Sequence, residues 1–260
     1  MAVSSYGDIQ RFVLVSDLDG TLIDHEHVGP EADPKLADFA RSLEAAGKRL
    51  TLWFNSSRPI ASQRESLERV PGLPVPRYQI GAMGTQVADG ATGELIADYG
   101  REQFGDWPRE EVERTCVETF GLVPHAAAMQ TAFKASFDLP DPQMAKAIES
   151  ELRGKGIDAK IVVSSGRDLD ILPPAAGKAA AIRWLVKHEN LAPESIVVSG
   201  DSANDLDMFD KPFRGIVVGN GHDDLRSQAP ARAGDCYLAK GLVAAGVLEG
   251  LRHLGVLPDA

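Results

Sequence analysis

The chain has 260 residues, of which 43% are hydrophobic and 25% charged, as in globular proteins with a packed core. Lys and Arg number 27 against 38 Asp and Glu, which gives a formal net charge of −11. Nucleic-acid binders usually carry a basic excess, and anionic membranes attract basic segments. We therefore expect neither nucleic acid nor a membrane as a partner.

The two cysteines, Cys116 and Cys236, exclude a disulfide framework and a zinc ribbon, and we expect both to be reduced thiols. The first residues lack the charged and apolar regions of a signal peptide. No apolar run reaches the ~20 residues that a membrane-spanning helix needs. We expect a cytoplasmic protein that acts as an enzyme.

The first third of the chain alternates short apolar runs with helical segments. RFVLVS at 11–16 is continuous, apolar and rich in β-forming residues, which suits a strand buried on both faces of a parallel sheet. Asp33, Pro34 and Gly47 are typical residues of a helix start and a helix end. The β-α-β-α-β order predicts a doubly wound sheet. The elements expected after the first strand are a helix at 34–46, a strand at 49–55, a helix at 60–69 and a strand at 77–81.

The pattern changes in the middle of the chain. Residues 131–139 alternate apolar and polar side chains, as in a strand with one face exposed to solvent. Such half-exposed strands indicate a small second α/β domain. The other elements expected there are helices at 106–120 and 142–154 and strands at 157–164 and 169–172.

Buried-strand patterns return after Pro173-Pro174. The fold class predicted for the chain is therefore α/β, with a doubly wound parallel-sheet core formed by residues 1–85 and 173–260 and an α/β domain inserted at 86–172. The elements expected in the last third are a helix at 176–188, strands within 195–205 and 214–221, a short strand at 236–239 and a helix at 242–253.

Two carboxylates follow the first buried strand. Asp17 and Asp19 in DLDGT are two residues apart, so both side chains can face the same site beyond the carboxyl end of the strand. Carboxylates this close repel one another unless a cation or a proton separates them, and Mg²⁺ prefers oxygen ligands. An Asx turn without a metal explains these five residues equally well.

A second acidic group follows a later buried strand, in SGDSAND. Asp201 ends that strand, and Asp205 lies four residues further on beside Asn204. These residues could instead cap a helix and favour its first turn. Capping does not account for two acidic groups that each end a buried strand. Together they predict an all-oxygen Mg²⁺ site.

Hydroxyl groups and one lysine complete the candidate site. Ser56 and Ser57 follow the second strand, where hydroxyl and backbone N–H groups can hold a phosphate oxygen. Lys178 follows Gly177 near a helix start, where the helix field disfavours a cation. A lysine there is best explained if it neutralises phosphate or the carboxylates.

In this order DLDGT, the Ser56 position, Lys178 and GDSAND resemble the four motifs of the haloacid dehalogenase (HAD) superfamily of phosphatases. The inserted domain is similar to the α/β cap of the second cap class, so the resemblance implies a Rossmann-like HAD core with that cap. The segments GAMGTQVADG, AFKASFDLPDP, SSGRDLDILPP and SGDSANDLDMF resemble sucrose-phosphate phosphatases and mannosylfructose-phosphate phosphatases.

The resemblance implies a role for each motif residue. Asp17 would be the nucleophile that forms an aspartyl-phosphate, and Asp19 would protonate the leaving sugar oxygen and then activate water. Ser56 and Lys178 would hold the transferring phosphoryl group, with Ser57 beside them. The implied metal set is Asp17, the Asp19 backbone carbonyl, Asp201, Asn204 and Asp205, with Mg²⁺ as the cofactor.

Two residues depart from the family pattern. Ser57 stands where relatives often have glycine, and Gly20 stands where sucrose-phosphate phosphatases tend to have asparagine. In the cap, the resemblance implies Lys134 as a sugar contact, mid-strand and facing the core. Gln130, Arg167 and Asp170 are further substrate-binding candidates.

The expected function is Mg²⁺-dependent hydrolysis of a disaccharide phosphate, with sucrose 6-phosphate as the first substrate. The alternatives are a phosphatase for mannosylfructose phosphate or another glycosyl phosphate, a sugar phosphomutase, and a non-catalytic sugar-phosphate sensor. A glycosyltransferase of the same pathway is a possible protein partner. His25-Glu26-His27 lacks further ligands at metal-binding spacing, so we expect a loop there.

Overall fold

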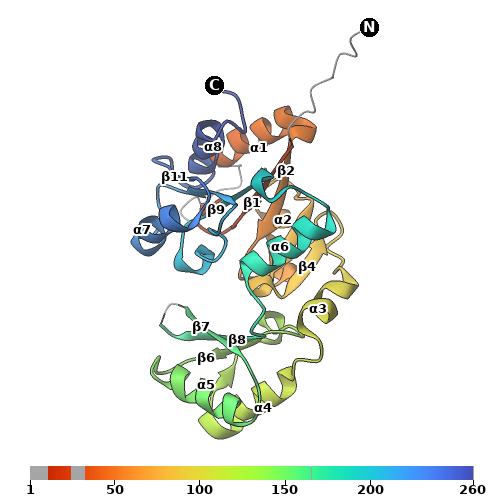
Figure 1. The fold of residues 1–260 in the computed structure, drawn as a ribbon, viewed down its shortest axis with the longest axis vertical. Coiled ribbons are helices and arrows are strands. Elements are labelled where there is room, and N and C mark those ends of the chain that lie inside the picture. Colours follow the sequence, from red (N-terminus) through yellow and green to blue (C-terminus); the bar gives the residue numbers. More distant parts are fainter. Residues whose placement is uncertain (1–10, 25–32, 165, 260) are drawn as a thin grey trace.

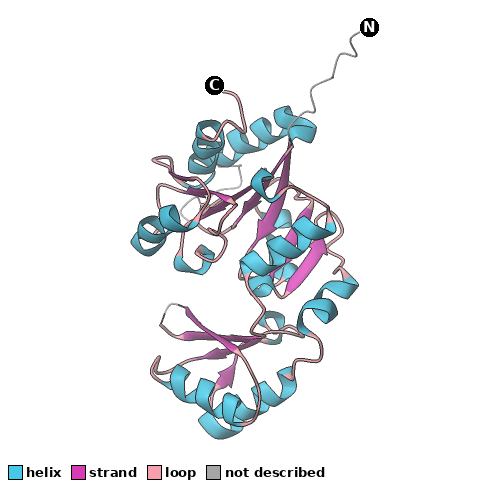
Figure 2. Cartoon of the chain, viewed as in Figure 1, coloured by secondary structure: helices cyan, strands magenta, loops and turns pink. Residues whose placement is uncertain are grey.

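The computed structural model describes residues 11–24, 33–164 and 166–259. These residues form a seven-stranded sheet and, below it in Figure 1, a four-stranded sheet. Helices accompany both sheets, so the predicted α/β class with a doubly wound core is confirmed (Figure 2).

The first strand of the chain, β1, lies at the centre of the large sheet, with three strands on either side of it. Its spatial order is β11-β10-β9-β1-β2-β3-β4, with all neighbours parallel except the antiparallel pair β3 and β4. All five residues of β1 are buried, as its continuous apolar run predicts. The strands are β1 (Phe12–Ser16), β2 (Leu50–Asn55), β3 (Tyr78–Gly81), β4 (Gln86–Asp89), β9 (Ile196–Gly200), β10 (Arg214–Val217) and β11 (Cys236–Leu238).

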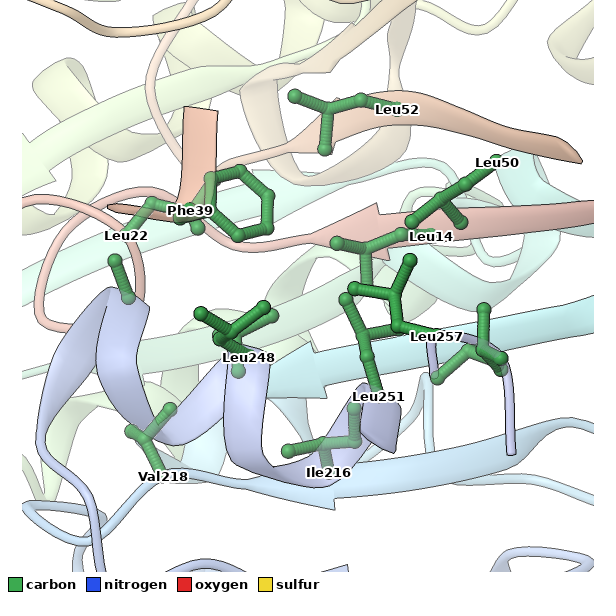
Figure 3. Close-up of a cluster of buried hydrophobic side chains, with 14 of the residues drawn as sticks. Leu14, Leu22, Phe39, Leu50, Leu52, Ile216, Val218, Leu248, Leu251 and Leu257 are labelled. Carbon is green, nitrogen blue, oxygen red and sulfur yellow. The ribbon is translucent and has the colours of Figure 1, made fainter. Parts of the chain in front are cut away.

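Successive side chains of β1 point to opposite faces of this sheet, and all of them are buried, so helices cover both faces. Leu14 belongs to one hydrophobic cluster, with Phe39 of α1 and Leu251 of α8 (Figure 3). Val15 belongs to the other cluster, with Ile182 of α6. The helices of this part are α1 (Pro34–Ala46), α2 (Ile60–Arg69), α3 (Ala97–Phe104), α6 (Lys178–His188), α7 (Asp223–Arg232) and α8 (Val243–His253).

The small sheet is entirely antiparallel, in the order β5-β6-β8-β7. Two helices cover the face turned away from the large sheet (Figure 1). Val112, Phe137 and Ile148 belong to the hydrophobic cluster of this domain. Its elements are α4 (Arg109–Phe120), β5 (Val123–Pro124), β6 (Ala135–Asp138), α5 (Met144–Gly154), β7 (Lys160–Ser164) and β8 (Asp168–Leu172).

The expected start of the inserted domain at residue 86 does not coincide with the change of sheet. β4 pairs with β3 in the large sheet, and Tyr99 of α3 is buried in one of the core clusters of that sheet. Neither β4 nor α3 was predicted from the sequence. Both are short, and β4 returns on β3 as an antiparallel hairpin, so the βα rhythm gave no signal for them.

Two expected elements of the small domain are shorter than predicted. The helix expected at 106–120 begins at Arg109, because the residue before Pro108 is disfavoured in a helical conformation. The strand expected at 131–139 covers only Ala135–Asp138. Thr131 and Lys134 instead close a turn through their backbone groups, at 3.2 and 3.4 Å. The expected mid-strand position of Lys134 is therefore wrong.

Both cysteines are free thiols, as expected. Among the described residues, no helix combines the length and the apolar character that crossing a bilayer requires. The His25-Glu26-His27 segment lies outside the described residues.

Candidate active site

The two acidic groups meet at one edge of the large sheet. β1 and β9 are parallel neighbours with Ser16 opposite Ser199, so Asp17 and Asp201 follow the carboxyl ends of adjacent strands. The Asp17 backbone N–H donates to the Ser199 carbonyl at 3.0 Å, which extends the sheet pairing to Asp17. The sequence prediction of a shared edge thus has its physical basis in the strand register.

Lys178 lies at the centre of this edge, with a side chain that is 0% exposed. Its Nζ donates to Asp17 Oδ1 at 2.8 Å and to Asp205 Oδ1 at 2.5 Å, and it lies 3.4 Å from Asn204 Oδ1. A buried ammonium with two carboxylate partners is held in one position. The first residue of α6 therefore connects the two acidic groups.

Asp205 is fixed by backbone groups as well as by Lys178. Its Oδ2 accepts from the backbone N–H groups of Asp201 and Ser202, at 3.0 and 3.1 Å. Asp201 in turn accepts from Thr21 Oγ1 at 3.2 Å. The carboxylates at this edge are thus oriented before any ligand arrives.

Three of these carboxylates could hold a metal ion. One oxygen each of Asp17, Asp201 and Asp205 lies within 4.8 Å of the others. A second such group among the described residues is His125, Asp138 and Asp168 on the small sheet. In that group His125 Nε2 lies 3.2 and 3.6 Å from the two carboxylates, which is also the arrangement of an ion pair.

The pKa values of the buried groups reflect the negative charge that is concentrated at this edge of the sheet. Burial raises the pKa of Asp17 to about 8, although Lys178 acts in the opposite direction. Burial and Asp205 raise the pKa of Asp201 to about 6. Burial alone would lower the pKa of Lys178, but Asp17 and Asp205 raise it above its usual range. Further positive charge at this edge would therefore favour the ionised carboxylates.

Asp19 lies on the DLDGT turn. Arg58, which follows strand β2, pairs with it, and Arg58 Nε is 2.7 Å from Asp19 Oδ2. Ser56 is buried, and its Oγ accepts from the Arg58 backbone N–H at 3.1 Å, whereas Ser57 is half-buried. Gly20 has φ +78°, and a Cβ there would lie 2.6 Å from Asp201 Oδ2. The close approach of Asp201 thus gives a physical reason for glycine at this departure from the family pattern.

The cap candidates separate into two groups. Lys134 is buried, and its Nζ donates to Asp170 Oδ1 at 2.9 Å; this oxygen also accepts from Ser136 Oγ at 2.6 Å. The side-chain amide of Gln130 bonds to the backbone of Ser136, at 2.8 and 2.9 Å, and therefore braces the cap. Arg167 is exposed next to the start of β8. The structure brings Lys134 and Asp170 together and gives Gln130 and Arg167 other surroundings.

Three residues that contact the site had no role predicted from the sequence. Thr21 bonds to Asp201, and Arg58 pairs with Asp19. Asn220 donates to the Gly20 carbonyl at 2.7 Å and accepts from the Val243 backbone N–H at 2.8 Å. Thr21 lies inside DLDGT and Arg58 directly follows Ser56 and Ser57, so their positions were a usable signal. Asn220 lies in a GNG segment that carried no such signal.

The doubly wound sheet with paired acidic strand ends and a buried lysine defines a phosphatase of the HAD class. The chain matches the family model described as sucrose-6F-phosphate phosphohydrolase over residues 10–255. The chain belongs to this family, and the resemblance predicted from its motifs is confirmed. It is accordingly a phosphoric monoester hydrolase.

Individual relatives agree with this assignment. The chain is 37% identical to a mannosylfructose-phosphate phosphatase of Agrobacterium fabrum, over 95% of this chain and 98% of that protein. It is 30% identical to sucrose-phosphatase 1 of Nicotiana tabacum, over 96% of this chain and 60% of that protein. The sucrose-phosphatase of Synechocystis, solved with sucrose and phosphate, superposes with a TM-score of 0.81 at 26% identity, over 96% of this chain and 100% of that one.

Proposed function

We propose that this protein hydrolyses the phosphate ester of a disaccharide phosphate through an aspartyl-phosphate on Asp17. The observation that carries the proposal is the position of Lys178 Nζ, which contacts Asp17 and Asp205 at the strand edge where Asp201 also lies. A nucleophile, a fixed cation and further carboxylates in one buried place suit phosphoryl transfer, in which positioning and charge stabilisation supply most of the catalysis.

The proposed cofactor is Mg²⁺, held by Asp17, Asp201 and Asp205, with Asn204 and the Asp19 carbonyl completing the set. All these donors are oxygens, which suits Mg²⁺, and the raised pKa values of Asp17 and Asp201 fit a site whose negative charge Lys178 only partly balances. When bound, Mg²⁺ would neutralise charge on the phosphate and orient it.

The residues divide the reaction between them. An Asp17 carboxylate oxygen attacks phosphorus while the bond from phosphorus to the sugar oxygen breaks, and Asp19 gives that oxygen a proton. Ser56, Ser57 and Lys178 hold the phosphoryl oxygens during the transfer. Asp19, kept in place by Arg58, then takes a proton from the water that hydrolyses the aspartyl-phosphate.

Two substrates are supported by different relatives. The family model and the Synechocystis structure favour sucrose 6-phosphate, which we place first. The Agrobacterium relative favours mannosylfructose phosphate, because it matches over nearly its whole length. The buried pair of Lys134 and Asp170 is the proposed sugar contact from the cap. Gln130 and Arg167 are proposed to support the structure of the cap and not to contact the sugar.

We place the cap between about Gly105 and Pro173, narrower than the range expected from the sequence, because β4 and α3 pack with the large sheet. The comparisons offer no support for the glycosyltransferase partner. A cytoplasmic location stays a prediction.

The test is phosphate release from sucrose 6-phosphate, mannosylfructose phosphate, trehalose 6-phosphate and hexose phosphates, with Mg²⁺ and with a chelator. We expect release from a disaccharide phosphate that needs Mg²⁺ and no bisphosphate activator. A requirement for that activator, with phosphate returned to the sugar, would identify a phosphomutase. Binding without turnover would identify a sensor.

A further inference from the structure

Asn55 is a buried polar residue next to the active site for which the proposed chemistry has no direct use. It is the last residue of β2 and directly precedes Ser56. Its side chain is 0% exposed. Strand ends of the other central strands carry the acidic groups, so this amide lies at the same edge of the sheet.

The side chain of Asn55 reaches the backbone of α6. Its Nδ2 donates to the Lys178 carbonyl at 3.1 Å and lies 3.3 Å from Met208 Sδ. Because a carbonyl oxygen can only accept, the amide nitrogen must face it and Oδ1 must point elsewhere. Oδ1 is buried and finds no hydrogen-bond partner among the described residues.

An unpartnered buried oxygen lowers stability, and an apolar side chain of the same shape would avoid that penalty. Buried polar atoms without a hydrogen-bond partner are rare in folded proteins, so the presence of this one needs an explanation. Here the reason lies in the bond from Asn55 to the Lys178 carbonyl. Lys178 is the first residue of α6, and Gly177 before it offers no side-chain cap. The bond from Asn55 holds the Lys178 carbonyl at this helix start from the neighbouring strand β2.

We propose that Asn55 is a positioning residue that holds the start of α6, so that the Lys178 ammonium reaches both Asp17 and Asp205. The inference deepens the proposed function and rests on it. Because Asn55 is adjacent to Ser56, the same side chain fixes the spacing between the two groups that would hold the phosphoryl oxygens. A shift of either group by a fraction of an ångström would misplace the transferring phosphate.

The variant that tests this is Asn55→Leu, which keeps the shape of the side chain and removes both the donor and the unpartnered oxygen. We expect kcat/KM for the preferred sugar phosphate to fall about tenfold, mainly in kcat, because a misplaced Lys178 holds the phosphoryl group less well in the transition state. We expect the midpoint of thermal unfolding to be unchanged or higher. A residue with a merely structural role would lower the unfolding midpoint and leave kcat unchanged. Asn55→Ala is the second variant if the leucine variant does not fold.

Gln79 provides a matched control. It is also 0% exposed, its Nε2 donates to the Gly90 carbonyl at 3.1 Å, and its Oε1 finds no partner among the described residues. Gln79 lies on β3 and does not contact Lys178. Gln79→Met should leave kcat/KM within about twofold of the wild type, since no group of the site moves.

Two further measurements test whether Asn55 affects the rate through the position of Lys178. In a Lys178→Met background, Asn55→Leu should no longer change the residual rate, because its target is gone. Crystal structures test the positioning without a substrate: Lys178 Nζ should leave hydrogen-bonding distance of Asp17 or Asp205 in Asn55→Leu and keep both contacts in Gln79→Met. Unchanged Lys178 contacts, or an undiminished effect in the double variant, would overturn the inference. Absence of phosphate release from the wild type would instead count against the proposed function.

Discussion

Replacing Lys178 by methionine should separate the electrostatic role of this residue from its packing. Methionine keeps most of the buried side-chain volume and removes the charge that faces Asp17 and Asp205. Breaking a buried ion pair on one side typically costs about 3–5 kcal/mol, because the remaining charges stay buried without compensation. In a protein of this size that loss lowers Tm by about 6–20 °C.

The measurement is calorimetric unfolding of wild type and Lys178→Met, each with a chelator and with Mg²⁺. We expect the large drop of Tm with the chelator and a larger gain from Mg²⁺ in the variant than in the wild type. The gain should be larger because a cation entering the carboxylate group no longer meets the Lys178 charge. Phosphate release should fall to a small residual rate under both conditions, since the methionine cannot hold a phosphoryl oxygen.

Lys134→Met is the matched control, because Lys134 is also fully buried and pairs with one carboxylate, Asp170. It should destabilise less than Lys178→Met, and its Tm should gain no more from Mg²⁺ than the wild type does. Its KM for the sugar phosphate should rise while kcat changes little. The reasoning is refuted if Lys178→Met without Mg²⁺ melts within about 2 °C of the wild type, or if Mg²⁺ raises the Tm of both variants equally.

Three other substitutions test single contacts. Asp17→Asn should abolish phosphate release and leave a cooperatively folded protein by circular dichroism; turnover in that variant would contradict the mechanism. Gly20→Ala should weaken Mg²⁺ binding by about tenfold or more in a calorimetric titration, because its Cβ would lie 2.6 Å from Asp201 Oδ2, and an unchanged affinity would show that the turn can adapt. Arg58→Lys should lower kcat by about tenfold, since Arg58 holds Asp19 and a lysine cannot reproduce the fixed guanidinium geometry; equal kcat values would remove Arg58 from the reaction.

The sequence was sufficient for the parts of the fold that repeat a simple pattern. Largely apolar runs predicted β1, β2 and β9, because strands buried on both faces consist mostly of apolar residues. The same runs located Asp17 and Asp201 at strand ends. Their proximity then followed from parallel pairing, in which neighbouring strands end at one edge.

Elements without a repeating pattern could not be predicted in the same way. β4 has four residues and pairs by a hairpin, so its place in the large sheet depends on the turn after β3 and not on its own side chains. Lys134 shows the related problem. AFKASF alternates like a strand, but the backbone bonds between Thr131 and Lys134 close a turn, so the strand begins only at Ala135, one residue after Lys134.

The limits of the sequence are clearest for side chains whose partners are backbone groups. Gln130 was predicted to contact substrate, yet its amide bonds to the Ser136 backbone, and Asn55 bonds to the Lys178 carbonyl 123 positions away in the chain. Every residue type has the same backbone groups, so a contact to the backbone leaves no sequence motif by which it could be predicted. Catalytic side chains act through their own chemistry and are therefore visible in sequence. The residues that place them act through geometry, which only the folded chain reveals.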